Sequence, residues 1–277
     1  MRLLVTGSKG FIGRNLVESY RNSSYEIVEL DLVDGADVRT ADLSKIKPDV
    51  IVHLAGLSGV RASDDDPESY ISNNVEGTVH LFNEARKHGV ERIVYASSSS
   101  IHGNGDDVPV SMYGLSKRMT EDIADLYYRR FGVKSVGMRF FTVYGTYGRE
   151  DMAVGKFAKK MIAGEPVPIY GDGTQSRDYT HVDDIVSAIH HCVESPRVTC
   201  DYVDIGAGKA FTVMDLIKAL AEALGVNNPT IIFCMRHCAD VDATLSDNSA
   251  LGELTGFRPR IAFAEGIRKY VEWLRGQ

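Results

Sequence analysis

The stretch LLVTGSKGFIG, residues 3–13, decides the fold class of this 277-residue chain. An apolar run from Leu3 to Thr6 predicts a buried strand, which passes directly into a turn with GxxGxxG spacing. The amphipathic stretch Ile12 to Arg21 then predicts a helix. In such a unit the glycines permit, in order, a tight turn, a close backbone approach to a ligand, and close packing of helix on strand. These glycines are Gly7, Gly10 and Gly13.

The same alternation of short apolar runs and amphipathic stretches continues through the first half of the chain. Four further apolar runs predict buried strands at Glu26 to Asp31, Val50 to Leu54, Arg92 to Ser97 and Ser135 to Phe140. Helical spacing predicts helices at Val75 to His88 and Tyr113 to Phe131. Strands that alternate with helices predict an α/β fold built on a doubly wound parallel sheet.

After Tyr147 the pattern becomes less regular and predicts a smaller lobe over the carboxyl edge of the sheet. Its expected helices are Met152 to Ala163, Asp183 to Glu194, Thr212 to Leu224 and Phe263 to Leu274. We expect residues 1–147, joined by 179–204, to form the sheet domain. Residues 148–178 and 205–277 then form the C-terminal lobe.

The glycine turn and the second strand predict a dinucleotide site. The first helix would offer free N–H groups at Phe11 and Ile12 to a pyrophosphate. Asp31 ends the second strand, where a carboxylate can accept hydrogen bonds from ribose hydroxyls and repels the 2′-phosphate of NADP. NAD is therefore favoured, with Asp37 and Val38 expected near its adenine. An ordinary tight turn and a solvated carboxylate are the alternative interpretations.

Composition excludes several function classes. The formal net charge of −7 disfavours nucleic acid as a partner. The first strand follows Met1 directly, and no apolar run is long enough to span a bilayer, so we expect a cytoplasmic protein with no membrane partner. Cysteines show no CxxC pair; a metal site at Cys234, His237 and Cys238 can be imagined, but we predict none.

Tyr113 and Lys117 are the candidate catalytic pair. They stand at i and i+4 and share one face of a helix. A nearby ammonium and a positive nicotinamide ring would both favour the phenolate; lowering its pKa by about three units takes roughly 4 kcal/mol. A run of serines, Ser97 to Ser100, ends the preceding strand, where parallel sheets bind ligands. Alone, YxxxK is common by chance, and the serines could form a polar turn.

Together these motifs resemble the extended short-chain dehydrogenase/reductases, in particular the NAD-dependent nucleotide-sugar epimerases and dehydratases. The matching segments run in order along the chain: 6–13, 53–56, 74–78, 97–100, 113–117, 139–145, 171–173, 177–179 and 181–184. The resemblance implies a Rossmann-type sheet and a catalytic triad of Ser98, Tyr113 and Lys117. It implies this cofactor-binding set: Gly7, Gly10, Phe11, Ile12, Gly13, Asp31, Asp37, Val38, Leu54, Ala55, Gly56, Asn74, Ser97, Tyr113 and Lys117.

The resemblance also implies a place for the sugar nucleotide. Arg177 would meet its diphosphate, and Arg236 and Asp240 its nucleotide end. The segment 236–240 departs from the family's basic-Pro-Gly-Asp pattern, which makes Arg236 the least secure of these residues. Two long helices, 75–88 and 113–131, pair between subunits in this family, so a homodimer is expected.

The residues that follow Ser98 narrow the reaction. Family dehydratases carry an Asp-Glu pair there, and the related decarboxylases carry a Glu, whereas this chain has Ser99 and Ser100. Neither serine acts as an acid or base at neutral pH. The motifs thus predict 4-epimerisation through a transient 4-keto sugar, with Tyr113 as the base.

The segment 139–153 narrows the substrate. Thr142, followed by Gly-Arg-x-Asp-Met-Ala, is similar to UDP-glucuronate 4-epimerases, where hydroxyls and the Arg recognise the C6 carboxylate. The expected substrate-binding residues are Ser99, Ser100, Thr142, Arg149, Arg177, Arg236 and Asp240. Interconversion of UDP-glucuronate and UDP-galacturonate is therefore predicted.

Other interpretations stay open. They are a UDP-glucose/UDP-galactose or N-acetyl 4-epimerase, a 4-keto-sugar reductase, a non-catalytic NAD sensor, and a surface role for Arg149. Two features depart from the family: the span from Gly103 to Met112 is short, and His102 and Thr146 replace a usual Tyr and Pro.

Overall fold

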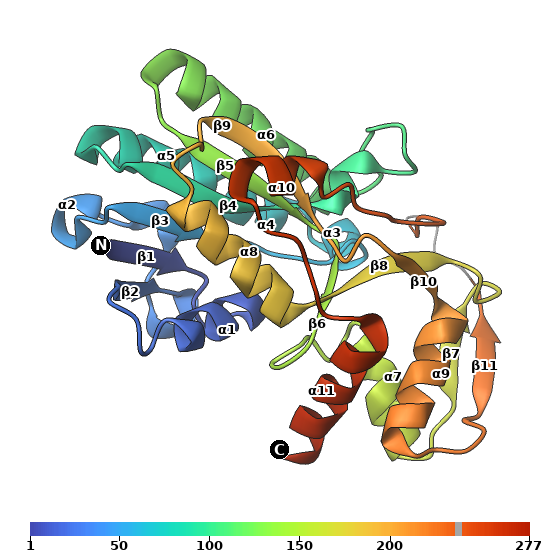
Figure 1. Ribbon diagram of the computed structural model, residues 1–277. Helices are drawn as coiled ribbons and strands as arrows, with labels where there is room; N and C mark the ends of the chain where they lie inside the picture. The colour runs from blue at the N-terminus through green and yellow to red at the C-terminus, as the bar shows by residue number, and fades with distance from the viewer. Residues whose placement is uncertain (236–239) are drawn as a thin grey trace.

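A central sheet of six parallel strands organises the molecule (Figure 1). The computed structural model describes residues 1–235 and 240–277. In spatial order the strands are β2 (Glu26–Leu30), β1 (Arg2–Thr6), β3 (Val50–His53), β4 (Arg92–Ser98), β5 (Ser135–Phe140) and β9 (Cys200–Ile205). The parallel α/β fold expected from the sequence is confirmed, and each of the five predicted strands lies within two residues of an observed one.

Both faces of the sheet are buried, which explains why the strands are apolar nearly throughout. Successive residues of β1 point to opposite faces: Leu3 and Val5 join one core, and Leu4 joins the other. The first core packs under α1 (Phe11–Ser19), α8 (Val182–Glu194) and α10 (Ser249–Thr255). The second packs under α2 (Leu43–Ile46), α5 (Gly77–His88) and α6 (Met112–Phe131).

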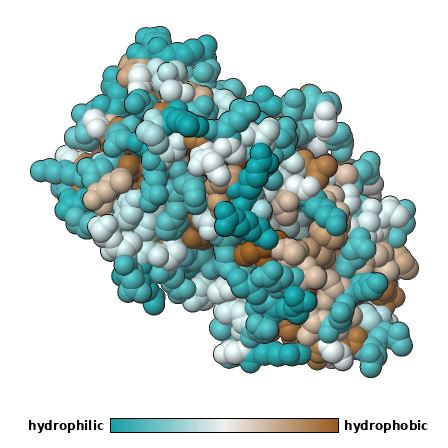
Figure 2. All heavy atoms as spheres, viewed as in Figure 1, coloured by the Kyte–Doolittle hydropathy of each residue, from teal (hydrophilic) through white to brown (hydrophobic). Residues whose placement is uncertain are grey.

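A smaller body is attached to the carboxyl edge of this sheet, and Figure 1 shows it at the lower right. Its core is formed largely by α7 (Ala153–Ile162), α9 (Val213–Leu224) and α11 (Phe263–Arg275). A sheet of β10 (Ala210–Thr212), β8 (Ser176–His181) and β6 (Thr142–Tyr144) connects the two bodies, and β11 (Ile231–Cys234) pairs with β7 (Val167–Tyr170). In Figure 2, apolar colour gathers over this smaller body, where Phe233 is 65% exposed on β11.

Several short turns and helices lie between the strands and the long helices, from β2 to α6. They are the 3-10 turns η1 (Leu32–Asp34), η2 (Val38–Thr40) and η4 (Ser99–His102), the helices α3 (Ala62–Asp65) and α4 (Pro67–Tyr70), and the π-helical turn η3 (Ile71–Glu76). No helix among the described residues is long and apolar enough to cross a membrane.

Candidate active site

The glycine turn lies at the carboxyl end of β1, and its backbone is packed too closely for side chains. Gly7 has a φ of +70°, and a Cβ there would lie 2.7 Å from the Ala55 nitrogen. A Cβ on Gly13 would lie 2.1 Å from the Gly7 oxygen. Gly10 precedes α1, where no side chain caps the helix, so the N–H groups of the first turn remain available to an anion. This cradle fits the pyrophosphate of a dinucleotide.

Asp31 lies beside this turn. Its carboxylate accepts hydrogen bonds from the Lys9 nitrogen at 2.9 Å and the Val33 nitrogen at 3.0 Å. Each oxygen therefore keeps a lone pair for a ribose hydroxyl. The structure thus places Asp31 next to the phosphate cradle, as a ribose ligand requires.

Asp37 and Val38 lie further along the same edge and are anchored by the protein itself. Two nitrogens of the Arg39 guanidinium donate to the Asp37 carboxylate, and this hydrogen bonding lowers the pKa of Asp37. Val38 is buried beneath the start of α5, where a Cβ on Gly77 would lie 2.8 Å from it. Both residues can line an adenine pocket, but the Asp37 charge is already paired.

The loop after β3 brings the predicted cofactor residues Gly56, Asn74 and Lys117 together. The Asn74 side chain accepts from the Leu57 nitrogen at 2.7 Å and donates to the Leu57 oxygen at 3.0 Å, which ties this loop to η3. A Cβ on Gly56 would lie 2.8 Å from the Asn74 amide and 3.5 Å from the Lys117 ammonium. Asn74 stands in the π-helical turn η3, a backbone irregularity that often marks functional sites. Leu54 and Ala55 lie against the glycine turn in the same loop.

Ser98 and Tyr113 meet at the carboxyl end of β4. The Ser98 hydroxyl acts on Tyr113 in the direction that lowers its pKa, and Ser98 also caps η4 by accepting from the Ser100 nitrogen at 3.2 Å. The Ser98 hydroxyl donates a hydrogen bond of 3.2 Å to the Ser100 hydroxyl. Ser99 is the first residue of η4 and is half-buried. The serines that replace an acidic pair are therefore gathered around the candidate base.

Lys117 lies one helical turn below Tyr113 and is buried. Its ammonium donates to the Ala96 oxygen at 2.8 Å, and burial lowers its pKa to about 8. Burial raises the pKa of Tyr113, while the Ser98 hydrogen bond and the Arg149 charge act in the opposite direction. The sequence points to Lys117 as the ammonium beside the tyrosine; in the structure Arg149 is the cation whose charge lowers the pKa of Tyr113.

A buried network that the motifs do not reveal supports this pair. The Glu121 carboxylate accepts two hydrogen bonds from the Arg139 guanidinium, each of 2.9 Å, and one of 2.6 Å from the Ser97 hydroxyl. Three successive residues of β4 thus contact α6: the Ala96 oxygen meets Lys117, Ser97 meets Glu121, and Ser98 meets Tyr113. The Ser97 hydroxyl is directed into this network, and contact of this residue with the cofactor stays a prediction.

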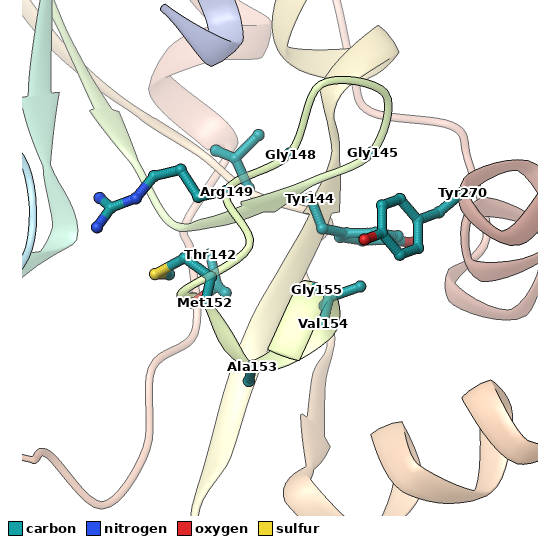
Figure 3. Close-up of a pocket in the computed structure, with 11 residues that line it drawn as sticks. Thr142, Tyr144, Gly145, Gly148, Arg149, Met152, Ala153, Val154, Gly155 and Tyr270 are labelled. Atoms are coloured by element: carbon teal, nitrogen blue, oxygen red, sulfur yellow. The ribbon is translucent and has the colours of Figure 1, made fainter. Parts of the chain in front are cut away.

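Thr142 and Arg149 lie at one end of a pocket along β6 and the start of α7 (Figure 3). In that view Arg149 points away from Tyr144 and Tyr270, which close the opposite end of the pocket. The lining residues are Thr142, Val143, Tyr144, Gly145, Gly148, Arg149, Met152, Ala153, Val154, Gly155 and Tyr270.

Arg149 is held in place by groups that the motifs did not single out. Two of its nitrogens donate to Asp151, and a third donates to the Ser58 hydroxyl in the loop after β3. The Tyr70 ring stands edge-on to Tyr113 at 6.2 Å between centroids, and its hydroxyl donates to the Ser58 oxygen at 3.1 Å. Arg149 is therefore a residue between the two bodies that faces the candidate base.

Arg177 lies at the start of β8, and Asp240 lies in the segment that follows β11. The Arg177 guanidinium donates to the Ser176 oxygen at 2.8 Å and weakly to the Asp242 oxygen at 3.4 Å. Asp240 accepts a hydrogen bond of 2.7 Å from Arg61, a residue that the sequence analysis missed. Arg236, predicted at the nucleotide end, lies outside the described residues, as do His237 and Cys238.

The buried carboxylate of Asp178, next to Arg177, ties the end of β9 to β8. It accepts hydrogen bonds from the backbone nitrogens of Ala207, Gly208 and Ser246 at 2.6–3.1 Å. The Ser246 hydroxyl adds a fourth donor at 2.7 Å. Asp178 thus fixes the strand from which Arg177 projects.

Among residues 1–235 and 240–277, a group with metal-ligand spacing comprises Asp42, Glu84 and His88. It lies away from the site described above, and its carboxylates are paired with Lys45 and Lys87. Because these carboxylates already have lysine partners, the group carries no metal assignment.

Comparisons with known proteins extend over the whole chain. The model of the NAD dependent epimerase/dehydratase family matches residues 3–206. The chain is 33% identical to the UDP-glucose 4-epimerase of Mycolicibacterium smegmatis, covering 100% of this chain and 99% of that protein. It is 30% identical to the UDP-glucuronate 4-epimerase of Thermodesulfobacterium geofontis, covering 93% and 82%. A solved UDP-glucuronic acid 4-epimerase from Bacillus cereus, in complex with UDP-glucuronic acid and NAD, is similar with a TM-score of 0.93 and 29% identity, covering 100% and 99%.

Proposed function

Because this chain belongs to the NAD-dependent epimerase/dehydratase family, we propose that it is a UDP-sugar 4-epimerase acting on UDP-glucuronate and UDP-galacturonate. Family membership confirms the resemblance drawn from the motifs, and it makes NAD the cofactor. The glycine cradle and Asp31 are the residues that would hold the dinucleotide. When bound, its nicotinamide accepts and returns the C4 hydride.

Tyr113 and Ser98 are suited to the proton transfer at the sugar O4. The Tyr113 phenolate takes the 4-hydroxyl proton while the Ser98 hydroxyl holds the oxygen, and the same tyrosine returns the proton after the 4-keto sugar has turned. The Arg149 charge and the Ser98 hydroxyl favour the anionic form of the base, and Lys117 is held one helical turn away by its hydrogen bond to the Ala96 oxygen. Ser99 and Ser100 offer no acid or base for removing water at C5 and C6, which disfavours dehydration.

The position of Arg149 carries the choice of substrate. The C6 carboxylate is two carbon–carbon bonds from the C4 that Tyr113 serves, so it must lie close to that tyrosine. Arg149 is near enough to act on the pKa of Tyr113, and Thr142 lies in the adjoining pocket. Since Asp151 already pairs with Arg149, we assign the direct bonds to the hydroxyls of Ser99, Ser100 and Thr142. The guanidinium then biases the pocket toward an anion.

The test is incubation of the purified protein and catalytic NAD⁺ with UDP-glucuronate and with UDP-glucose, read by NMR of the C4 configuration. We expect UDP-galacturonate from the first and little turnover of the second. Turnover of UDP-glucose alone would reject the glucuronate assignment. A requirement for stoichiometric NAD(P)H would instead indicate a 4-keto-sugar reductase.

Two variants separate the roles within this proposal. Tyr113→Phe should bind NAD and UDP-sugar yet lose turnover, because it lacks the hydroxyl that carries the proton. Arg149→Ala should raise KM for UDP-glucuronate more than for UDP-glucose, and Arg149→Lys is its charge-preserving control. Equal effects of Arg149→Ala on both sugars would contradict its role in selecting the anion.

We also propose a homodimer formed by α5 and α6. Val79 on α5 and Leu115, Leu126 and Phe131 on α6 are large apolar side chains that are 41–48% exposed. Paired helices would cover them. A monomeric mass in light scattering at micromolar concentration would contradict this assembly.

A further inference from the structure

Arg61 reaches from the sheet domain across to the smaller body. It stands in the loop after β3, directly before α3. Its guanidinium donates to the Asp240 carboxylate at 2.7 Å and lies over the Tyr170 ring, 4.4 Å from the centroid. Both partners belong to the smaller body: Tyr170 ends β7, and Asp240 follows β11. The contact joins two segments that are far apart in sequence.

This contact lies in line with the proposed substrate positions along β8. Thr142 pairs with Tyr179 in the middle of β8, and Arg177 lies two residues back toward the start of that strand. The chain after Asp240 pairs with Ser176, since the Ser176 nitrogen donates to the Asp242 oxygen at 3.0 Å. A ligand with its sugar at Thr142 and its phosphates at Arg177 therefore directs its nucleoside toward Asp240. Arg61 contacts the chain at that same residue.

The chemistry of Arg61 suits a diphosphate. A planar guanidinium binds phosphate oxygens through paired hydrogen bonds and is only weakly hydrated. The side chain is 43% exposed, in contrast to Arg139 in its buried pair, so it can change partners at little cost. Lys156 lies on the same Tyr170 ring at 5.2 Å, which adds a second positive charge to this corner. In a chain with net charge −7, such a corner is a local site for an anion.

We propose that Arg61 is a diphosphate-binding residue that exchanges Asp240 for the phosphates of the nucleotide sugar, and that this exchange releases Asp240 to the ribose hydroxyls. The proposal rests on the proposed nucleotide-sugar function. In the free protein the ion pair holds Arg61 over the nucleotide path. On binding, the ligand supplies both a stronger anion for Arg61 and hydroxyl donors for Asp240.

Binding of UDP and of uridine separates the two halves of this exchange. We expect Arg61→Ala to weaken UDP binding by about 10- to 100-fold, the range for losing a charge-assisted hydrogen-bonding partner, and to leave uridine binding within about twofold. Asp240→Asn should weaken uridine binding, because the ribose hydroxyls lose the Asp240 carboxylate. UDP binding should weaken less, because Arg61 is then released from its competing carboxylate and is available to the phosphates. Titration calorimetry measures UDP, and NMR line shifts measure the weaker uridine.

Controls distinguish a phosphate contact from a structural effect. Arg21→Ala removes another exposed arginine, paired with Glu18 at the end of α1, and should change neither ligand. NAD binding should be unaltered in Arg61→Ala, and its kinetic effect should appear in KM for the UDP-sugar with kcat nearly unchanged. Arg61→Lys should recover part of the UDP affinity.

The outcomes decide between the proposals. Unchanged UDP affinity in Arg61→Ala, or equal losses for UDP and uridine, would overturn the exchange while leaving the epimerase proposal intact. A wild-type protein that binds NAD but no uridine nucleotide would reject the proposed function itself.

Discussion

Replacement of Glu121 by alanine tests the buried network beneath Tyr113 and Lys117, the proposed catalytic pair. Glu121 is 3% exposed and accepts three hydrogen bonds, two from Arg139 and one from Ser97. Its removal leaves a guanidinium and a hydroxyl without their acceptor in the interior. Breaking a buried pair from one side costs about 3–5 kcal/mol; because the Arg139 side chain is 22% exposed, water recovers part of this, and we expect about 3 kcal/mol.

This loss should be visible as a lower melting temperature. A chain of 277 residues has an unfolding entropy near 0.6 kcal/mol/K, at about 2 cal/mol/K for each residue. The Glu121→Ala protein should therefore melt about 5 °C below wild type in differential scanning calorimetry. Glu165→Ala, which breaks an exposed pair with Lys160, serves as control and should shift the melting temperature by about 1 °C or less.

A double variant shows whether the cost comes from the unpaired charge. Glu121→Leu combined with Arg139→Met removes both charges and should be more stable than Glu121→Ala alone. A melting temperature for Glu121→Ala within 2 °C of wild type would refute the reasoning, as would a double variant less stable than the single one.

Further substitutions test the cradle, the β8 anchor and the pH dependence. Gly13→Ala should abolish NAD binding in calorimetry, because its Cβ would lie 2.1 Å from the Gly7 oxygen; retained NAD affinity would show that the turn can shift. Asp178→Ala should lower stability in urea unfolding by about 3 kcal/mol or more, since three backbone N–H groups and the Ser246 hydroxyl lose their buried acceptor, and a loss below 1 kcal/mol would contradict this. Burial lowers the pKa of His53 to about 3, so between that value and the unfolded value near 6.5 the unfolded chain binds more protons, and stability must rise with pH by up to about 1.4 kcal/mol per unit. His53→Gln should flatten the melting temperature between pH 5 and 6.5, although burial shifts His181 the same way and some slope will remain; an unchanged slope would exclude His53 as a source.

The strands and helices of the regular first half could be predicted from the sequence because these strands are buried on both faces. Continuous apolar runs and glycine-bounded helices leave few alternatives, and α6 was placed to within one residue. The strands β6, β7, β8, β9, β10 and β11 were missed. They have three to six residues, are partly exposed or polar, and are defined by pairing between distant segments, which no local pattern records.

The site was predictable where a motif names the residue, and not where a partner lies far away in sequence. The period of two in a strand could have separated Ser97 from Ser98, since Ser97 shares the face of Tyr95 that packs toward α5 and α6. Glu121 stands one turn beyond Lys117, and Arg139 is a charge inside an apolar strand, so a buried pair was detectable in principle. Arg61 and Ser58 carry no such signal, because their partners come from the smaller body.

The pKa of Tyr113 connects these observations. Burial raises it, so the tyrosine in the protein alone is a weaker base than a free one. The groups that oppose burial come from different parts of the fold: Ser98 from β4 and Arg149 from the loop before α7. Under the proposed reaction, the base therefore becomes effective only where the serine edge of the sheet, the arginine of the smaller body and a positively charged cofactor ring converge. Under the proposed substrate assignment, the same arginine biases the sugar pocket toward an anion, so activation of the base and selection of a uronic acid would depend on one side chain. Asp151 and Ser58 hold that side chain in place, which makes them part of the specificity although neither needs to touch the substrate.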